Sequence, residues 1–528
     1  MQKKFNFRPY LITVCMTTVL WSSEILSQCV ATESDSAAAD KPSVHVRKEA
    51  VPEIASGDPA EPAIHGPRII GCGPGHPFFY KVPFTGEGNV TISAEGLPSG
   101  LSINARGFIS GSIKSPGEYR IKLKAKNALG ESSRNLKLAV GDHKLALTPP
   151  MGWNSWNVWA GDVDAAKVKA AAEAMIASGL AAKGFQYINI DDTWEGDKRS
   201  PDGEITSNKK FGDMKALAKF VHSKGLRLGI YSSPGPKTCA GYLGSYQHED
   251  QDAKTYADWQ IDYLKYDWCS YGDIDKGNSL ESFQKPYSVM HHALDRVDRD
   301  IVYSLCQYGM GDVWTWGGSA QIGGNCWRSS GDIADNWSSM SRNGFALDKI
   351  SKYASPGHWN DPDMLIVGKL GWGASIHNTK LTPNEQLSHI TLWCMVASPL
   401  LIGCDMTQMD KFTRDLLSNT ELIDIDQDPL GKAAVCVSRE GDTEVWARPL
   451  FDGTYAVALF NRAAEEAKVE TSWKCLRESF PQAANLKGKQ PLRNLWTRKA
   501  LAESDGYSSV IPRHGAVLLK VGAPHAEQ

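Results

Sequence analysis

The sequence predicts a three-domain protein in which a (β/α)8 barrel lies between two antiparallel β-sandwiches. Three observations lead to this fold class. The chain has 528 residues, which is too long for one ordinary domain. Strand-like and helical segments alternate through its middle, over about the length that a (β/α)8 barrel needs. On both sides of that region the pattern changes to short alternating strands separated by turn residues.

The first 31 residues have the composition of an export signal. Three cationic residues precede an apolar run, Leu11 to Trp21, and small residues follow up to Ala31. We predict a signal peptide at residues 1–31 and a secreted or periplasmic protein. The run is too short to predict a membrane span. Because Gln28 fits a lipid-attachment motif poorly, we favour simple cleavage over a lipid anchor at Cys29.

The next two segments differ in their hydropathy pattern. Residues 32–66 are rich in Ala, Ser, Pro and charge without an apolar period, which predicts a linker. Residues 67–141 alternate between apolar and polar residues, which predicts an Ig-like β-sandwich module. The strand-like segments of this module are 78–82, 90–93, 119–124 and 135–139.

Residues 147–430 predict the barrel. Eight strand-like segments follow one another at 151–155, 187–190, 227–231, 263–266, 301–304, 325–328, 358–360 and 400–403. Helical periodicity lies between them at 168–179, 213–223, 253–260, 281–297 and 385–397. An open doubly wound sheet is the alternative, but no phosphate-binding glycine fingerprint follows the first strand. Eight strands with intervening helices therefore favour a closed (β/α)8 barrel.

Alternation returns in the C-terminal region. We predict an antiparallel β-sandwich at residues 431–523 that packs on the barrel. Its strand-like segments are 435–437, 443–446, 455–460 and 516–519.

Composition excludes several classes of function. The net charge of −3 and the lack of a basic stretch predict no binding to nucleic acid or to an anionic membrane. No Gly-X-Ser-X-Gly motif is present, which argues against a serine hydrolase. The predicted strand ends lack the His and Cys clusters of a zinc site, so we predict no metal and no cofactor. A carboxylate site for Mg²⁺ or Ca²⁺ stays open.

Polar and aromatic residues gather at the carboxyl ends of the predicted barrel strands, where barrel enzymes place their catalytic groups. These residues are Trp156, Asp191, Asp192, Tyr231, Lys265, Asp267, Gln307, Arg328, Asp332, Asp361 and Asp363. Because neighbouring residues of a strand point to opposite faces, we expect at most one of Asp191 and Asp192 to face the pocket centre.

Two carboxylates on different strand ends are what glycoside hydrolysis requires. We predict that Asp267 is an ionised nucleophile, favoured by the charge of Lys265 on the same side of the strand. The alternative is that these two residues form a purely structural ion pair. We predict that Asp332 is the proton donor. Arg328 favours the ionised form of Asp332, so this role requires a partly dry pocket and a negative neighbour that together outweigh Arg328.

At these residues the chain resembles a known family. Residues 147–430 resemble the catalytic domain of glycoside hydrolase family 27, the α-galactosidase and melibiase family of clan D. The matching motifs run in order: Thr148–Trp156, Ile190–Trp194, Gly229–Tyr231, Lys237–Gly241, Asp258–Trp259, Leu264–Asp267, Trp327–Arg328, Gly331–Ile333, Trp359–Leu365, Asn384–Gln386, Leu392–Trp393 and Asp426–Gly431. The N-terminal module resembles, through Gly66–Ile69 and Gly96–Ser102, an Ig-like module of bacterial glycoside hydrolases.

The resemblance implies a retaining mechanism, with Asp267 as nucleophile and Asp332 as acid/base. It implies binding roles for the other residues: Asp191 and Asp192 toward O4 and O6 of galactose, Lys265 toward O3 and O4, Arg328 toward O2, and Trp156 and Tyr231 as pocket walls. It also implies a disulfide between Cys239 and Cys269 beside the active site.

One position departs from the family pattern. The family commonly has Cys-Glu-Trp after the fifth strand, where the Glu binds the sugar 2-hydroxyl, whereas this chain has Cys306-Gln307-Tyr308. Gln307 can still accept a hydrogen bond but lacks the charge. The pair does not make room for an N-acetyl group, so we favour a sugar with a free 2-hydroxyl and keep Gln307 as a substrate-binding residue.

The predicted function is therefore a secreted, retaining exo-glycosidase that removes terminal α-D-galactosyl residues from oligosaccharides or glycoconjugates. Other family 27 activities stay open, namely β-L-arabinopyranosidase, α-N-acetylgalactosaminidase and isomalto-dextranase. The alternative of another class is a non-catalytic carbohydrate-binding protein on a barrel scaffold. The predicted partner is an α-galactoside, and self-association into a homo-oligomer stays open.

Overall fold

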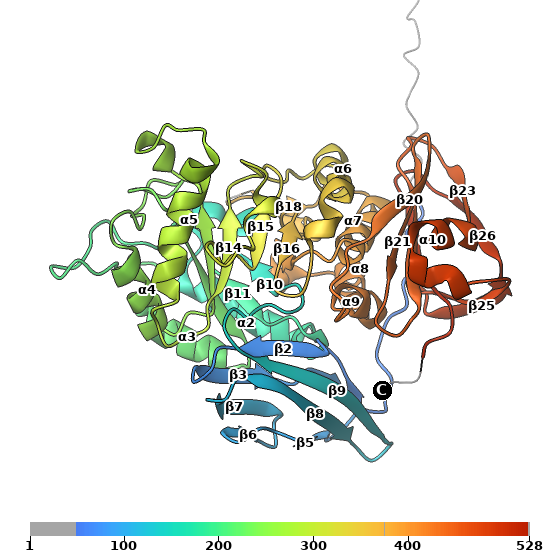
Figure 1. Ribbon diagram of the computed structural model, residues 1–528, viewed down its shortest axis with the longest axis horizontal. Helices are drawn as coiled ribbons and strands as arrows, with labels where there is room; N and C mark the ends of the chain where they lie inside the picture. Colours follow the sequence, from blue (N-terminus) through green and yellow to red (C-terminus); the bar gives the residue numbers. More distant parts are fainter. Residues whose placement is uncertain (1–48, 374, 526–528) are drawn as a thin grey trace, which may run out of the picture. The chain divides into compact units, whose positions relative to one another are not determined.

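The computed structural model describes residues 49–373 and 375–525 (Figure 1). The predicted signal peptide and residues 32–48 of the predicted linker lie outside these ranges.

Eight parallel strands form the central sheet, which confirms the predicted barrel. They are β10 (Met151–Asn154), β11 (Tyr187–Asn189), β12 (Arg227–Ser232), β13 (Tyr263–Asp267), β14 (Val302–Cys306), β15 (Cys326–Arg328), β16 (Trp359–Asp361) and β19 (Leu400–Ile402). Their order is β16-β15-β14-β13-β12-β11-β10-β19, and every pairing is parallel. A single parallel bridge between Leu365 and Ile402 joins the two edges. The strands are buried along nearly their whole length, as barrel strands covered by helices must be.

Helices connect these strands, and the last two helices follow the final barrel strand (Figure 1). They are α1 (Trp156–Trp159), α2 (Ala165–Ala177), α3 (Met214–Ser223), α4 (Glu249–Asp258), α5 (Leu280–Leu294), α6 (Trp337–Phe345), α7 (Pro383–Met395), α8 (Lys411–Leu417) and α9 (Thr420–Asp426). Side-chain caps mark where they begin: Asp164, Asp213, Ser279 and Thr382 each accept a hydrogen bond from a backbone N–H of the first turn. A short hairpin, β17 (Lys369–Leu370) and β18 (His377–Asn378), precedes α7.

The N-terminal module is a β-sandwich, as the alternating pattern predicts. Its strands are β1 (Ala63–Ile64), β2 (Ile69–Cys72), β3 (Pro77–Lys81), β4 (Phe84–Thr85), β5 (Thr91–Glu95), β6 (Leu101–Ile103), β7 (Phe108–Ser112), β8 (Gly117–Lys126) and β9 (Glu131–Val140). Two sheets, ordered β2-β9-β8-β5 and β3-β7-β6, enclose an apolar core. In β8, buried Ile121, Leu123 and Ala125 alternate with residues that face solvent.

The module contacts the amino ends of the barrel strands. Asp300, two residues before β14, accepts hydrogen bonds from the backbone N–H of Gly73 at 3.0 Å. His76 Nδ1 lies 2.8 Å from the same carboxylate. Arg227, the first residue of β12, donates to the carbonyl of Phe79. Polar contacts thus hold this end of the barrel to the module.

The described part of the predicted linker contacts the rest of the chain. The backbone N–H of Ala55 donates to the carbonyl of Trp496 at 2.8 Å, and Glu53 pairs with Lys499 at 2.5 Å. Residues 49–62 contain no helix or strand. Their contacts are hydrogen bonds, ion pairs and an apolar contact of Ile54 with the barrel core, and these leave no apolar period from which the sequence could predict them.

The C-terminal domain is an antiparallel sandwich, as predicted. Its elements are β20 (Val435–Glu440), β21 (Thr443–Pro449), β22 (Tyr455–Asn461), β23 (Ala467–Ser472), α10 (Trp473–Ser479), β24 (Gln490–Asn494), β25 (Lys499–Ser504), β26 (Gly506–Ile511) and β27 (Ala516–Val521). A six-stranded sheet, β20-β21-β22-β27-β24-β25, packs against α7 on one face and carries the pair β23-β26 beside it. Helix α7 is therefore buried on nearly all sides between the barrel and the sandwich.

Within the described ranges, no helix is both long and apolar enough to cross a membrane.

Candidate active site

The carboxyl ends of the barrel strands surround one cavity. Its lining includes most of the site residues that the sequence predicts: Trp156, Asp191, Asp192, Tyr231, Cys239, Lys265, Asp267, Arg328 and Asp332. It also includes Asn157, Tyr308, Ile333, Asp363, Met364 and Trp372. Gln307 and Cys269 lie next to lining residues but not on the cavity wall.

Asp267 is the last residue of β13, and its side chain is buried at the base of this cavity. Only 5% of the residue is exposed. Tyr231 donates its hydroxyl hydrogen to Asp267 Oδ2 at 3.1 Å, and Tyr308 donates to Oδ1 at 2.7 Å. One phenol thus holds each carboxylate oxygen, which orients the carboxylate plane.

The charge near Asp267 differs from the sequence expectation. Burial raises the pKa of Asp267 above its ordinary value, and the charge of Lys265 and the hydrogen bond from Tyr308 lower it only in part. Lys265 Nζ lies 2.8 Å from Asp191 Oδ2 and pairs with that carboxylate. The expected effect of Lys265 is present, because its charge lowers the pKa of Asp267, but burial outweighs it and the ion pair of Lys265 is with Asp191.

Asp191 and Asp192 both line the cavity, contrary to the expectation that at most one would face it. Strand β11 ends at Asn189, so the alternation of a strand does not govern the two following residues. Asp191 Oδ2 accepts from Lys265 and from Asn154 Nδ2 at 2.8 Å. Asp192 Oδ2 accepts from the backbone N–H of Ala240 at 2.8 Å. Burial raises the pKa of Asp192.

Arg328, the last residue of β15, holds two carboxylates. Its Nη2 lies 3.0 Å from Asp332 Oδ1 and 3.1 Å from Asp363 Oδ2. The side chains of Arg328 and Asp363 are buried, whereas that of Asp332 is 73% exposed. The pair of Arg328 and Asp363 is therefore a fixed part of the wall, and Asp332 lies at the solvent side of the cavity.

Gln307 is fully buried beneath the cavity wall. Its Nε2 donates to the carbonyl of Met310 at 2.9 Å, and its Oε1 has no hydrogen-bond partner within the described ranges. Gln307 thus differs in place from the other predicted binding residues. The residue after it, Tyr308, reaches the cavity instead.

Cys239 and Cys269 form a disulfide with a Cα–Cα distance of 5.0 Å. Cys239 follows β12, and Cys269 comes two residues after Asp267. Tyr231 Oη lies 3.3 Å from Cys269 Sγ. The bridge therefore holds the loops after β12 and β13 together, directly behind the phenol that contacts Asp267. Asp267 and the two sulfurs lie close enough for a metal ion, but the disulfide removes both thiolates.

Two lining residues have roles that strand-end reasoning does not predict. Tyr308 has a φ of +61°, a left-handed conformation that is uncommon for a residue with a side chain. The departure from the family pattern at this position was the available signal. Trp372 lies on the loop between β17 and β18 and is distant in sequence from any barrel strand end. Its backbone N–H donates to the carbonyl of Asn157 at 3.0 Å. No sequence pattern marks that contact.

The arrangement combines two carboxylates in different surroundings. Asp267 is buried and fixed by two phenols, so it can attack an electrophilic carbon held above it. Asp332 is exposed and paired with Arg328, so the partly dry surroundings expected for its role as proton donor are not present around it. From the entrance it can exchange protons with solvent and with a leaving group. Such a pair fits cleavage of a glycosidic bond.

Comparison with known families agrees with this geometry. The family described as "Alpha galactosidase A" matches residues 148–428, and that described as "Alpha galactosidase C-terminal beta sandwich domain" matches residues 440–521. An Ig-domain family matches residues 74–141.

Individual relatives give the same result. Alpha-galactosidase 2 of Arabidopsis thaliana is 46% identical over 332 residues, which cover 62% of this chain and 79% of the relative. Alpha-galactosidase A of Cellvibrio japonicus is 40% identical over 395 residues, which cover 72% of this chain and 93% of the relative. The crystal structure of a Bacteroides fragilis protein with 36% sequence identity superposes on this chain with a TM-score of 0.81. The match covers 88% of this chain and 98% of the Bacteroides fragilis chain.

Proposed function

This chain belongs to the alpha-galactosidase family of glycoside hydrolases, family 27, and we propose that it is an exported exo-enzyme that releases terminal α-D-galactose with retention of configuration. Hydrolysis of α-galactosides follows from the family and its relatives. The retaining mechanism, the residue roles and the export are our proposal. The observation that carries the mechanism is that buried Asp267 and exposed Asp332 share one cavity at the carboxyl ends of the barrel strands.

In the first step, Asp332 donates a proton to the glycosidic oxygen while an oxygen of Asp267 attacks the anomeric carbon. The bond to the leaving group breaks, and an ester bond forms between galactose and Asp267. In the second step, Asp332 removes a proton from water, which attacks the same carbon and releases the carboxylate of Asp267. Two inversions give net retention. The phenols of Tyr231 and Tyr308 support this chemistry because they fix the attacking carboxylate.

The remaining lining residues are proposed to position the sugar. Asp191 is anchored by Lys265 and Asn154, which leaves carboxylate lone pairs and ammonium protons for sugar hydroxyls. Asp192 supplies a second carboxylate beside it. The resemblance assigns these groups to the O3, O4 and O6 side of galactose, where the axial O4 distinguishes the sugar. Trp156 and Tyr231 provide the apolar and aromatic wall on which a sugar ring packs.

The 2-position is the part of the pocket that departs from the family pattern. Gln307 is buried behind the wall, and the bulky ring of Tyr308 lies at the cavity in its place. An N-acetyl group needs open space there. We therefore propose a sugar with a free 2-hydroxyl and place α-N-acetylgalactosaminides among the poor substrates.

Export is proposed from residues 1–31 and is supported by the disulfide, which is typical of oxidising compartments. Mass spectrometry of the protein recovered from the producing cell's exterior or periplasm tests it. An N-terminus near residue 32 is expected. A cytosolic protein that keeps residues 1–31 would contradict export without affecting the catalytic proposal.

A panel of 4-nitrophenyl glycosides tests the substrate. The panel contains the α-D-galactoside, the α-N-acetylgalactosaminide, the β-L-arabinopyranoside and the α-D-glucoside, each with the mature protein and with Asp267→Asn. We expect preference for the α-D-galactoside. A β-L-arabinopyranoside is a galactoside without C6, so preference for it would mean that contacts near O6 reject galactose. Tight binding of galactose without turnover would instead favour a carbohydrate-binding protein.

A further inference from the structure

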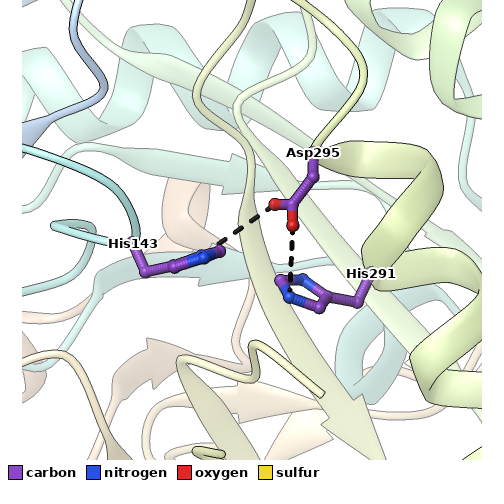
Figure 2. Close-up of side chains that lie close together, drawn as sticks. All are labelled: His143, His291 and Asp295. Atoms are coloured by element: carbon purple, nitrogen blue, oxygen red, sulfur yellow. Dashed lines mark ion pairs between the residues drawn. The ribbon is translucent and has the colours of Figure 1, made fainter. Parts of the chain in front are cut away.

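A cluster of metal-ligating side chains lies at the opposite end of the barrel from the proposed active site. We propose that His143, His291 and Asp295 bind one divalent transition-metal ion of the Zn²⁺ type (Figure 2). His291 Nε2 lies 3.3 Å from Asp295 Oδ2, and His143 Nδ1 lies 3.9 Å from Asp295 Oδ1. One ligand atom of each residue lies within 4.8 Å of the others.

These separations suit a tetrahedral ion after a small adjustment. Zn²⁺ with nitrogen and carboxylate ligands needs ligand atoms about 3.3–3.5 Å apart. The pair of His291 and Asp295 already has this spacing. His143 lies 3.9 Å from the other oxygen of Asp295, and the three ligand atoms lie within 4.8 Å of one another, so His143 and Asp295 must move by up to about 1.5 Å to reach the same spacing. The side chains of His143 and Asp295 are 45% and 44% exposed, so both can shift, whereas His291 is buried and fixed.

The backbone explains why these groups face one another. His291 and Asp295 lie four residues apart at the C-terminal end of α5 and therefore on one face of the chain. Gly323 covers the other ring nitrogen of His291, where a Cβ would lie 2.1 Å from Nδ1. Nε2 therefore lies on the open side of the ring, near both the carbonyl of Ala320 and the carboxylate of Asp295. His143 has a φ of +58°, an unusual conformation for a residue with a side chain, and this turn brings its ring to 5.1 Å from that of His291.

Proton competition sets the strength of the proposed site. His291 Nε2 also lies 3.0 Å from the carbonyl of Ala320, to which it donates when that nitrogen carries the proton. A metal ion replaces this proton, so the carbonyl must turn away or become a further ligand.

The surroundings favour a cation. A cavity of about 410 Å³ adjoins the cluster, which leaves room for water to complete the coordination shell. Asp142 also lines it, so the local charge is negative. His76 and Asp300 lie on the same cavity but bind each other and the backbone of Gly73, so we do not include them as ligands.

The proposed ion would join the connection between two domains to the barrel. His143 lies between the last strand of the module, β9, and the first barrel strand, β10, whereas His291 and Asp295 belong to the end of α5. An ion held by all three ties the connecting segment to the barrel helix. Its expected effect is on stability, and hydrolysis at the other end of the barrel should not depend on it.

Titration with Zn²⁺ tests the proposal on the untagged mature protein after treatment with a chelator. Isothermal titration calorimetry should give one Zn²⁺ per chain at pH 7.5, and Tm should rise by several degrees at saturation. His143→Ala and Asp295→Asn should each weaken binding at least tenfold, because each removes one of three ligands. Mg²⁺ should not bind, since the site contains imidazole ligands.

His377→Ala is the matched control. His377 is also exposed and lies 3.8 Å from Asp335, but it belongs to no group of three ligands within the described ranges. The Zn²⁺ affinity of the His377→Ala variant should equal that of the unaltered protein. The rate of α-galactoside hydrolysis should be unchanged in His143→Ala, Asp295→Asn and His377→Ala. If the unaltered protein binds no Zn²⁺, or if His143→Ala and Asp295→Asn bind it with unchanged affinity while circular dichroism shows them folded, the cluster is only an ion pair and the proposal fails. A misfolded His143→Ala would be replaced by His143→Gln, for which the same result is expected.

Discussion

Two buried aspartates at the two ends of strand β13, Asp262 and Asp267, differ in the partners that hold their carboxyl groups. Asp262 precedes the strand at its amino end and is buried. His222 Nε2 lies 2.7 Å from one of its oxygens, which also accepts from the backbone N–H of Leu228 at 2.8 Å, and Arg299 donates to the other at 2.6 Å. Asp267 ends the strand and is equally buried, but among the described residues its side-chain oxygens accept hydrogen bonds only from two neutral phenols.

Burial acts to raise the pKa of both carboxyl groups, but their net pKa shifts have opposite signs. Burial opposes the charge of Asp262, but the hydrogen bond from His222 and the charge of Arg299 prevail and lower its pKa below the ordinary value. For Asp267 burial prevails and raises the pKa. A carboxylate whose lone pairs are saturated by cations stabilises the fold, whereas one held by weak donors keeps lone pairs for a substrate. The difference between the two ends therefore lies in the partners.

Asp267→Asn should produce the largest effect on activity. We expect kcat for 4-nitrophenyl α-galactoside to fall by about 10⁴-fold or more, because an amide does not attack the anomeric carbon. Tm should stay equal or rise. The folded-state pKa of Asp267 is raised, so its ionised form disfavours folding at neutral pH, and the variant removes that cost. Kinetics and calorimetry check both parts. If the variant kept more than a tenth of the activity, Asp267 would not be the nucleophile.

Asp262→Asn should affect stability and spare catalysis. Removing this carboxylate leaves Arg299 and His222 partly buried without their anion, so we expect the free energy of unfolding to fall by about 3 kcal/mol. The folded-state pKa of Asp262 is lowered, so its contribution is present above the ordinary Asp pKa, near 4, and is lost as the pH falls below that value. Tm measured between pH 3 and 7 should therefore fall more steeply at the acid end in the unaltered protein than in Asp262→Asn, which keeps other carboxyl groups of lowered pKa such as Glu385 and Asp452. A large loss of kcat at full stability would contradict a structural role.

Asp332→Asn separates the proton donor from an ion-pair partner of Arg328. We expect kcat/KM to fall by about 10²–10⁴-fold for an α-galactoside with a sugar leaving group, which needs a proton to depart. The loss should be smaller for the first step with 4-nitrophenolate, which leaves without one. Parallel assays with the two substrates measure this difference. Equal losses would indicate that Asp332 only positions Arg328.

Tyr308→Phe should give a smaller and more specific effect. It removes the hydrogen bond that lowers the pKa of Asp267, so the acid limb of the kcat/KM profile should move to higher pH. A hydrogen bond to a charged group contributes about 1.5–3 kcal/mol, which corresponds to a loss of about 10- to 100-fold in kcat/KM. Tyr303→Phe is the control, because its hydroxyl donates to the carbonyl of Tyr287 outside the catalytic cavity. An unshifted profile for Tyr308→Phe would make its contact with Asp267 incidental.

Local pattern was sufficient to predict the barrel and the strand ends. A strand end is marked by where apolar periodicity stops, and parallel strands bring all carboxyl ends to one edge, so Asp267, Lys265 and Arg328 could be placed near one another from sequence. The ion-pair and hydrogen-bond partners of these side chains could not be predicted from the sequence. Whether Lys265 pairs with Asp267 or with Asp191 depends on the loop after β11, which no longer obeys strand alternation.

The sequence also could not predict the contacts of the cavity loops or those at the amino end of the barrel. Tyr308 reaches Asp267 only because its backbone adopts a positive φ, and nothing in its residue type requires that conformation. His143 and His291 are 148 positions apart and look unrelated in the sequence, yet the turn before β10 brings them together. Such contacts depend on tertiary structure, and short-range periodicity carries no information about them.

The anomeric configuration of the first product tests the central claim most directly. Proton NMR can follow the galactose released from 4-nitrophenyl α-D-galactoside during the first minutes, before mutarotation mixes the anomers. If Asp267 is a nucleophile, as proposed, α-galactose appears first and the β-anomer grows in later. If β-galactose appears first, the enzyme inverts, no bond forms to Asp267, and the assignment of the two carboxylates is wrong.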